Sequence, residues 1–305
     1  MAQDMGERAS RMLSIAIVAS VVATLALAQP ATASPEIVFS RRGDIFTVEP
    51  DGSGVRRIAH RRAAEHMPVW SPAHDRVAFL SWSRRIVIVD ADGAHRHVIY
   101  RLPRRFEAIT GLAWSPDGTR IAFAAAREKG RDHPSGPKDC GQVRWISSTG
   151  GSTHVVINGE PHITGISWSP DGQWLAVGFE HQNMTRACGD DRPLGIARVR
   201  LDGSGLRGLG PDLATDPDWS PDGRWIAYRD WRRTCHACGE IWVVRPDGTR
   251  DHVLTPVPAS DGGLRQPRYS PSGRRLIALG DGIWVLDGDG TLRRRIVAHA
   301  TSIDW

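Results

Sequence analysis

The sequence predicts an all-β protein, a propeller of six blades with four antiparallel strands each, on three observations. A five-residue turn motif recurs along the chain, a short apolar strand follows each copy, and the 305 residues include 32 Gly and 20 Pro. Units of short strands and tight turns repeating every forty to fifty residues are typical of propellers. The composition, 40% hydrophobic and 24% charged, is that of a globular protein.

The turn motif reads Trp-Ser-Pro-Asp-Gly. Intact copies begin at Trp114, Trp168 and Trp219, and altered copies begin at Trp70 and Tyr269. Proline fixes φ at the first central position, aspartate tolerates the second, and glycine accepts the exit conformation. Each copy therefore predicts a tight turn between the first and second strands of a blade.

The remaining strands of each unit follow in a constant order. The second strands are predicted at Ile37–Phe39, Val77–Phe79, Ile121–Phe123, Leu175–Val177, Ile226–Tyr228 and Leu276–Ala278. The third strands are predicted at Ile45–Val48, Ile86–Val89, Val143–Ile146, Ile196–Val199, Ile241–Val244 and Ile283–Leu286. A second glycine-containing turn ends each third strand, and an arginine-rich fourth strand leads to the next motif aromatic.

The two ends of the repeat region predict circular closure. The sixth motif aromatic, Trp305, ends the segment Thr301–Trp305, whereas the first unit begins at its second strand, Ile37–Phe39. The C-terminal strand should therefore pair with this early strand and complete a blade. We assign residues 34–305 to a single six-bladed domain.

The Trp-Ser-Pro-Asp-Gly turn followed by an Ile-Ala-Phe type strand resembles the TolB-like propeller repeat, a relative of the WD-type repeats. The resemblance extends from about Ser34 to Trp305. It implies a six-bladed propeller that acts as a non-catalytic protein- or ligand-binding module of the cell envelope.

Residues 1–33 are predicted to be a secretory signal peptide. Arg8 and Arg11 precede the uncharged stretch Met12–Ala28, and Ala26–Ala28 and Ala31–Ala33 both have the small-x-small pattern of a cleavage site. We favour cleavage over an uncleaved membrane anchor because the apolar run is close to the lower limit for a spanning helix. Both interpretations predict an extracytoplasmic location (periplasmic, secreted or cell-surface) with no membrane span after the signal.

The basic residues do not predict a nucleic-acid partner. The net charge of +5 is modest for 305 residues, and only Lys129 and Lys138 are lysines. The arginines are expected on the outermost strands, where charge discourages edge-to-edge pairing. These arginines are Arg56, Arg57, Arg96, Arg207, Arg250 and Arg293–Arg295. Because they are spread around the rim and not gathered on one face, we expect a soluble monomer.

Three long connections predict where a partner binds. The loops from second to third strand expand to 124–141, 178–195 and 229–239 in three consecutive repeats, all on the face opposite the glycine turns. Long loops clustered on one sector of a scaffold are common binding sites. We expect them to bind an envelope protein or a polar ligand. The candidate contacts are Arg127, His133, His181, Arg186, Trp231, Arg232 and His236.

All four cysteines, Cys140, Cys188, Cys235 and Cys238, lie in these loops. An oxidising compartment favours two disulfides, and we prefer Cys235–Cys238 with Cys140–Cys188. A four-thiolate zinc site is the alternative, since Cys-x-x-Cys pairs are common zinc ligands.

The central channel is the second candidate site. His66, Thr110, Thr164, Thr215, Arg265 and Thr301 each stand four residues before a motif aromatic, where they could ring the channel mouth. His66 and Arg265 are the members that carry or can carry charge, and we take them as binding candidates. Asp216, Asp218 and Asp304 lie close by in the same strands and are expected to pair with Arg265 and Arg268.

The sequence predicts neither a catalytic residue nor a resident cofactor or metal. It contains no Gly-x-Ser-x-Gly elbow, so nothing indicates nucleophilic catalysis of the hydrolase type. The alternative is a calcium-dependent hydrolase or lactonase that uses the channel, although a calcium site needs six or more oxygen ligands.

Overall fold

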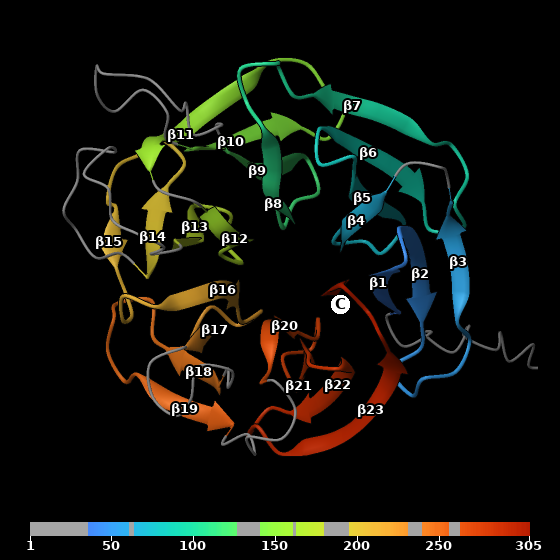
Figure 1. The fold of residues 1–305 in the computed structure, drawn as a ribbon. Helices are drawn as coiled ribbons and strands as arrows, with labels where there is room; N and C mark the ends of the chain where they lie inside the picture. The colour runs from blue at the N-terminus through green and yellow to red at the C-terminus, as the bar shows by residue number, and fades with distance from the viewer. Residues whose placement is uncertain are drawn as a thin grey trace, which may run out of the picture. The chain divides into compact units, whose positions relative to one another are not determined.

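The structure, a computed structural model, describes residues 36–60, 64–126, 141–160, 163–179, 195–230, 240–255 and 263–305. All of them belong to one compact unit. Within these residues every regular element is a strand, and the 24 strands form six four-stranded antiparallel sheets, the blades of a propeller (Figure 1). The predicted fold class is confirmed.

The four strands of each blade follow one another from the innermost, beside the channel, to the outermost. Blade 1 consists of β24 (Ser302–Asp304), β1 (Ile37–Arg41), β2 (Asp44–Val48) and β3 (Arg56–Ala59). Blade 2 consists of β4 (Glu65–Trp70), β5 (Arg76–Ser81), β6 (Arg85–Asp90) and β7 (His97–Arg101). Blade 3 consists of β8 (Ala108–Trp114), β9 (Arg120–Ala126), β10 (Gly141–Ser147) and β11 (Thr153–Glu160).

The second half of the ring repeats the same order. Blade 4 consists of β12 (Ile163–Trp168), β13 (Trp174–Phe179), β14 (Ile196–Arg200) and β15 (Arg207–Gly208). Blade 5 consists of β16 (Ala214–Trp219), β17 (Ile226–Asp230), β18 (Glu240–Val244) and β19 (His252–Thr255). Blade 6 consists of β20 (Arg265–Tyr269), β21 (Arg275–Leu279), β22 (Gly282–Asp287) and β23 (Leu292–Ala298).

The ring is closed by β24, as the repeat predicts. This strand pairs with β1 in the register Val38↔Asp304, Phe39↔Ile303 and Ser40↔Ser302. The Ser302 and Ser40 hydroxyls lie 2.5 Å apart, and the Thr301 backbone N–H donates to the Ser40 carbonyl at 2.9 Å. Figure 1 shows the C-terminus beside β1, at the inner side of the ring.

The core lies between blades. Six hydrophobic clusters are found among the described residues, one at each interface between neighbouring blades. Trp70 of blade 2 packs with Val38 and Ile45 of blade 1, and the motif tryptophans of the other blades repeat this arrangement. These tryptophans act as wedges, since burying their large rings against the preceding blade holds the ring together.

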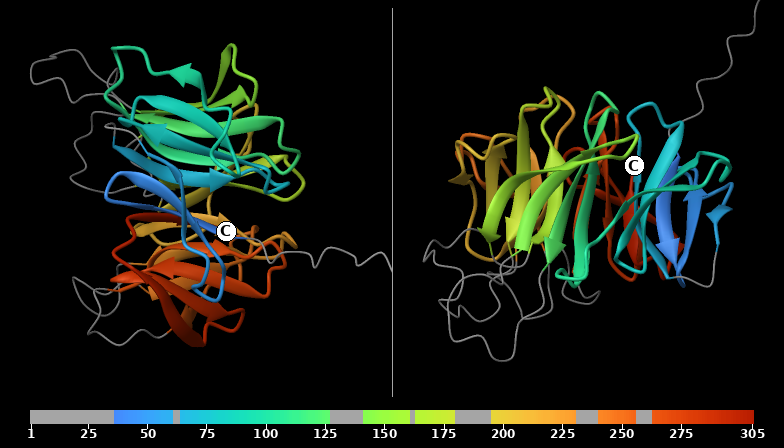
Figure 2. Two further views of the ribbon diagram at one scale, coloured as in Figure 1. Left: turned by 90° about the vertical axis from the view of Figure 1, so that its right-hand side faces the viewer. Right: turned by 90° about the horizontal axis from the view of Figure 1, so that it is seen from above.

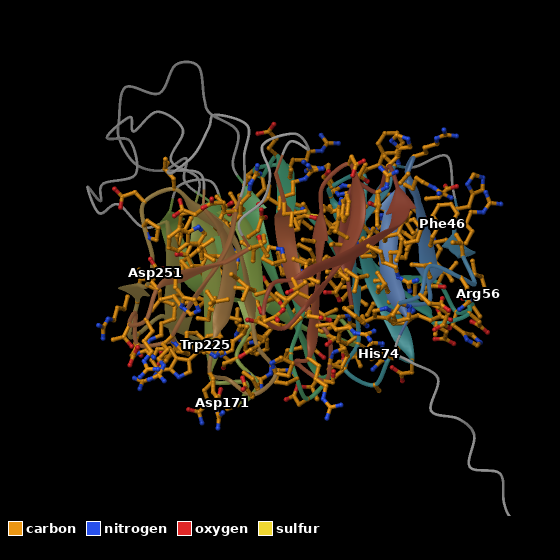
Figure 3. All side chains as sticks on the ribbon, turned by 90° about the horizontal axis from the view of Figure 1, so that it is seen from below. Phe46, Arg56, His74, Asp171, Trp225 and Asp251 are labelled. Atoms are coloured by element: carbon orange, nitrogen blue, oxygen red, sulfur yellow. The ribbon has the colours of Figure 1, made fainter. Side chains whose placement is uncertain are left out.

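The connections divide between two faces. The motif turns and the turns from third to fourth strand lie on one face, which we call the turn face. The connections from second to third strand, and those from one blade to the next, lie on the other, which we call the loop face (Figure 2). In the side view, His74, Asp171 and Trp225 all lie toward the turn face (Figure 3).

One predicted outer-strand arginine has a different role. Arg96 precedes β7 and its guanidinium extends inward, 5.1 Å from the ring centroid of Phe79 and 2.8 Å from Glu65, whose side chain is fully buried. The outer-strand interpretation is therefore wrong for Arg96, because a buried carboxylate needs a cationic partner.

Candidate functional site: the channel and its two mouths

The innermost strands line a channel with two rings of side chains. The first ring, which we call the waist, is made by the residues three positions before each motif aromatic: Met67, Gly111, Gly165, Asp216, Gln266 and Ser302. The ring at the turn-face mouth is made by the residues one position before: Val69, Ala113, Ser167, Asp218, Arg268 and Asp304. Positions two apart on a strand share a face, which explains why these two sets point inward.

Bulges in the innermost strands shape the waist. The pairing register shifts between His66 and Val69 in blade 2, and at the corresponding places in blades 5 and 6. Met67, Asp216 and Gln266 within these bulges have positive φ values of 52°, 54° and 50°. A bulge re-aims a side chain without ending the sheet, and here it turns the strand starts toward the channel axis.

The space at the waist is small. Its cavity measures about 30 Å³. A single water needs about 10–15 Å³ on this measure, so the waist has room for two or three waters.

The turn-face mouth is wider, with a hollow of about 360 Å³. Its rim consists of the six motif aromatics and five motif prolines, namely Trp70, Trp114, Trp168, Trp219, Tyr269, Trp305, Pro72, Pro116, Pro170, Pro221 and Pro271. The floor carries charge at Asp218, Arg268 and Asp304. Ligand pockets commonly combine an apolar wall with a few polar groups in this way.

The charged floor connects neighbouring blades. Asp304 lies 3.6 Å from the Arg268 guanidinium and accepts the Trp70 backbone N–H at 2.9 Å. Asp218 accepts the Tyr269 backbone N–H at 2.8 Å. In each case the acceptor belongs to one blade and the N–H to the next, so the two carboxylates stabilise the ring.

Burial changes the protonation of these acids. It raises the pKa of Asp218 to about 6 and that of Asp304 to about 7, even though Arg268 attracts both anions. Burial also raises the pKa of Asp216, and it lowers the pKa of the nearby Arg229 to about 10. The channel thus holds carboxyls that titrate near neutral pH, a property often found at functional sites.

Some of the predicted channel residues line the channel or form the expected ion pair, and others lie elsewhere. The expected pair Arg268–Asp304 is formed. Thr110 and Thr164 line the waist. His66 is half-buried at the loop-face end of β4, with its Nε2 atom 2.9 Å from the Ser83 hydroxyl, and burial lowers its pKa. Arg265 contributes a favourable charge to Asp216.

The predicted loop contacts and all four cysteines lie outside the described residues. They are Arg127, His133, His181, Arg186, Trp231, Arg232, His236, Cys140, Cys188, Cys235 and Cys238. The strand ends that bound these loops are described: Ala126 and Gly141, Phe179 and Ile196, Asp230 and Glu240. All six ends open on the loop face of the consecutive blades 3, 4 and 5.

Sequence reasoning missed the turn-face hollow. The sequence prediction placed the channel candidates four positions before each motif aromatic. The useful signal is the residue directly before the aromatic, which is apolar or small in blades 2 and 3 but Asp218, Arg268 and Asp304 in blades 5, 6 and 1.

Metal-ligating groups and membrane-spanning helices are both absent from the described part of the chain. There, no three side chains of His, Cys, Asp or Glu come together as a metal-binding group. In the same residues no helix has the length and apolar character to cross a membrane.

Comparison with protein families matches the WD domain, G-beta repeat, to residues 145–185. Among curated proteins, dipeptidyl-peptidase 5 of Porphyromonas gingivalis is 26% identical over 231 residues, covering 62% of this chain and 33% of that protein. The Tol-Pal system protein TolB of Alcanivorax borkumensis is 29% identical over 145 residues, covering 43% and 30%. The alignments thus span about a third of each relative's length.

Solved structures share the fold. TolB from Acinetobacter baumannii aligns with a TM-score of 0.66 and 17% identity over 90% of this chain and 67% of that one. A putative TolB from Agrobacterium tumefaciens gives 0.66 and 19% over 88% and 91%. An oligogalacturonate lyase in complex with manganese gives 0.59 and 17% over 85% and 72%. With its repeated turn motif, its closed ring and these neighbours, the chain is a TolB-like six-bladed β-propeller.

Proposed function

We propose that this chain is an exported, non-catalytic propeller that docks a protein or a polar ligand of the cell envelope on its loop face. The observation that carries the proposal is the position of the strand ends bounding the loops 124–141, 178–195 and 229–239. They open side by side on one face of three consecutive blades. Loops presented together by a rigid scaffold form a continuous binding surface.

The envelope location is proposed from two independent sources. The N-terminal segment 1–33 has the pattern of a signal peptide. The chain is also similar to a Tol-Pal system protein, TolB, over 145 residues. Cleavage of the signal, the two disulfides and a monomeric state belong to the same proposal.

The channel supports a non-catalytic role. Its waist admits only a few waters, and Asp218 and Asp304 each accept a backbone N–H of the neighbouring blade. Carboxylates engaged in holding blades together are poorly placed to approach a substrate. The geometry therefore favours docking at the surface over chemistry in the channel.

A catalytic alternative rests on the turn-face hollow. There Asp218 and Asp304, with pKa values raised to about 6 and 7, stand beside Arg268 under a hollow of about 360 Å³. Acids that titrate in this range can transfer protons at neutral pH. The similarity to a peptidase and to a lyase in complex with manganese also supports an enzymatic function. The enzyme we consider here is a calcium-dependent hydrolase or lactonase.

The docking proposal is tested by affinity capture from envelope extract with purified protein. We expect the intact protein to retain a defined partner and a variant with all three long loops shortened to lose it. A matched control carries Thr149→Ala and Arg250→Ala on the turn face and should retain the partner. Equal capture by the loop variant and the intact protein would refute docking at these loops.

The catalytic alternative is tested by metal analysis of the purified protein together with an esterase and lactonase screen. Tightly bound calcium with turnover that disappears in Asp304→Asn would establish an enzyme. Absence of turnover with every ester and lactone, with and without added calcium, would remove this alternative.

A further inference from the structure

Trp82 is unusually exposed for a tryptophan. Its side chain is 58% exposed, the largest value for a large hydrophobic residue in the described part of the chain, and it is the one aromatic in that group. It occupies the turn between β5 and β6, so it lies on the loop face. The neighbouring motif tryptophans, in contrast, are at least nine-tenths buried.

The backbone at this turn is strained. Trp82 and Ser83 both have positive φ values, 56° and 52°, and the Arg84 N–H donates to the Ser81 carbonyl at 3.3 Å. Two successive positive φ values are typical of hairpin turns built from Asn and Gly. A large aromatic side chain fits this conformation poorly, because its Cβ atom crowds the backbone carbonyl. The turn would form more easily with another residue, so folding does not explain the tryptophan.

The turn is also held rigidly. The Trp82 N–H donates to the Ala64 carbonyl at 3.0 Å, and the Ser83 carbonyl accepts the Ile109 N–H at 2.7 Å. The Arg84 guanidinium donates to four carbonyls of the following connection, those of Leu102, Pro103, Phe106 and Glu107. A fixed backbone orients Trp82 before any partner arrives, which reduces the entropy lost on binding.

Exposed arginines lie on the segments next to this turn. Arg42 lies on the β1–β2 turn, whose Gly43 carbonyl accepts the Glu65 N–H next to Ala64. Arg85 and Arg101 face each other across β6 and β7, and Arg104 and Arg105 lie in the connection after β7. All five arginines are exposed, and none forms an ion pair with a carboxylate of the described residues.

We propose that Trp82 anchors the docking of an acidic, amphipathic protein segment, with these five arginines pairing with its carboxylates. Tryptophan and arginine are the residues that most often dominate protein–protein binding. A single-stranded nucleic acid would require several aromatics in succession, and a membrane surface would require a broader apolar face. The inference rests on the proposed function, because it names the chemistry of a partner on the same face.

The test uses the full chain and a labelled synthetic peptide of glutamate and leucine arranged as an amphipathic helix. We expect saturable binding, measured by fluorescence anisotropy and weakened by salt. In Trp82→Asn the affinity for the peptide should fall by about tenfold or more. Asparagine accepts positive φ readily, so this variant should keep or raise the melting temperature while losing the peptide. The double variant Arg85→Gln/Arg101→Gln should bind more weakly and lose part of the salt dependence.

Val55→Ala serves as the matched control, since Val55 is 47% exposed but lies between β2 and β3 on the turn face. Unchanged binding in this variant, with loss in Trp82→Asn, supports the proposal. The proposal is overturned if no peptide binds, if Trp82→Asn binds as tightly as the intact chain, or if a lysine–leucine peptide binds equally well. It is also overturned if only anionic vesicles or single-stranded DNA bind at Trp82. If capture of the envelope partner depends on the long loops but not on Trp82, the proposed docking function is retained and the proposal for Trp82 fails.

Discussion

At the scale of single residues, the serine and aspartate of the motif hold each turn through hydrogen bonds. The Ser115 hydroxyl donates to Asp117 at 2.5 Å and accepts the Arg120 backbone N–H at 2.9 Å. The serine bond is the main cause that holds the pKa of Asp117 well below its usual range. In the altered copy that starts at Trp70, Ser71 uses Asp75 as its acceptor at 2.6 Å, so the bond survives the loss of the motif aspartate.

Replacing Ser115 should therefore destabilise the protein. Ser115 is fully buried, and Ser115→Ala leaves the Arg120 N–H without its acceptor. We expect the free energy of unfolding, measured by urea titration, to fall by about 1–3 kcal/mol. The control Ser152→Ala, at an exposed position, should change it by less than about 0.5 kcal/mol. Equal effects from both substitutions would contradict this account of the turn.

The channel acids predict a pH dependence of stability. Burial raises the pKa of Asp218 from 3.8 to about 6 and that of Asp304 from 3.8 to about 7. Between pH 3.8 and these raised values, the folded chain therefore binds more protons than the unfolded chain. The stabilisation from these two groups is present at low pH and is lost as the pH rises through 6 and 7. Asp304→Asn should thus flatten the decline in melting temperature between pH 5 and 8.

The matched control is Asp202→Asn on the turn between β14 and β15. Hydrogen bonds from Ser204 lower the pKa of Asp202, so its contribution changes only below its ordinary value of 3.8. Calorimetry of this variant should give the same slope between pH 5 and 8 as the unsubstituted chain. A slope unaltered in Asp304→Asn would show that the channel acids do not titrate there.

At the scale of elements, the three-residue strand β24 makes many of the contacts that close the ring. It supplies the inner partner of β1, while its Ser302 hydroxyl accepts the Met67 N–H at 2.9 Å and Asp304 accepts the Trp70 N–H. Ile303 and Trp305 belong to the hydrophobic cluster between blades 6 and 1. The outermost two-residue strand β15, in contrast, is exposed at both positions.

Removing β24 should break the ring, whereas disrupting β15 should not. Deletion of Ser302–Trp305 exposes the edge of β1 and empties part of the cluster, so we expect a broad, non-cooperative transition or insoluble protein. Arg207→Pro, which interrupts β15, should shift the melting temperature by only a few degrees. Differential scanning calorimetry of both variants makes the comparison, and a sharp transition after deletion would contradict closure by β24.

At the scale of the whole molecule, the two faces differ in what they offer. The turn face carries the motif turns around an aromatic hollow, and the loop face carries the strand ends that bound the three long connections, together with Trp82. A scaffold whose repeated residues hold the ring is free to vary its connections, and binding is expected where they vary.

The cysteines supply a prediction at this scale, since the three loops that contain them belong to three consecutive blades, 3, 4 and 5. We expect no titratable thiols in the denatured, unreduced protein, and a lower melting temperature after reduction, because disulfides restrict the unfolded chain. Thiol titration with zinc quantified alongside makes the measurement. Four titratable thiols with one zinc per chain would establish the zinc alternative.

Much of this molecule follows from its sequence alone. The spacing of the turn motif determines the blade count, and the presence of an inner strand at one end and a second strand at the other determines the closure through β24. Both are consequences of a local pattern, because each turn and each alternating strand is specified by a few adjacent residues.

The tertiary structure alone decided which side chains share a space. The bulges at Met67 and Asp216 turn the inner strands, so the residues one and three positions before the aromatics form the two rings of the channel. Of the residues four positions before, Thr110 and Thr164 line the waist beside them. Arg96 finds its carboxylate, Glu65, only when the sheets pack. Contacts of this kind depend on the twist and stacking of whole sheets, and no local pattern of residues records them.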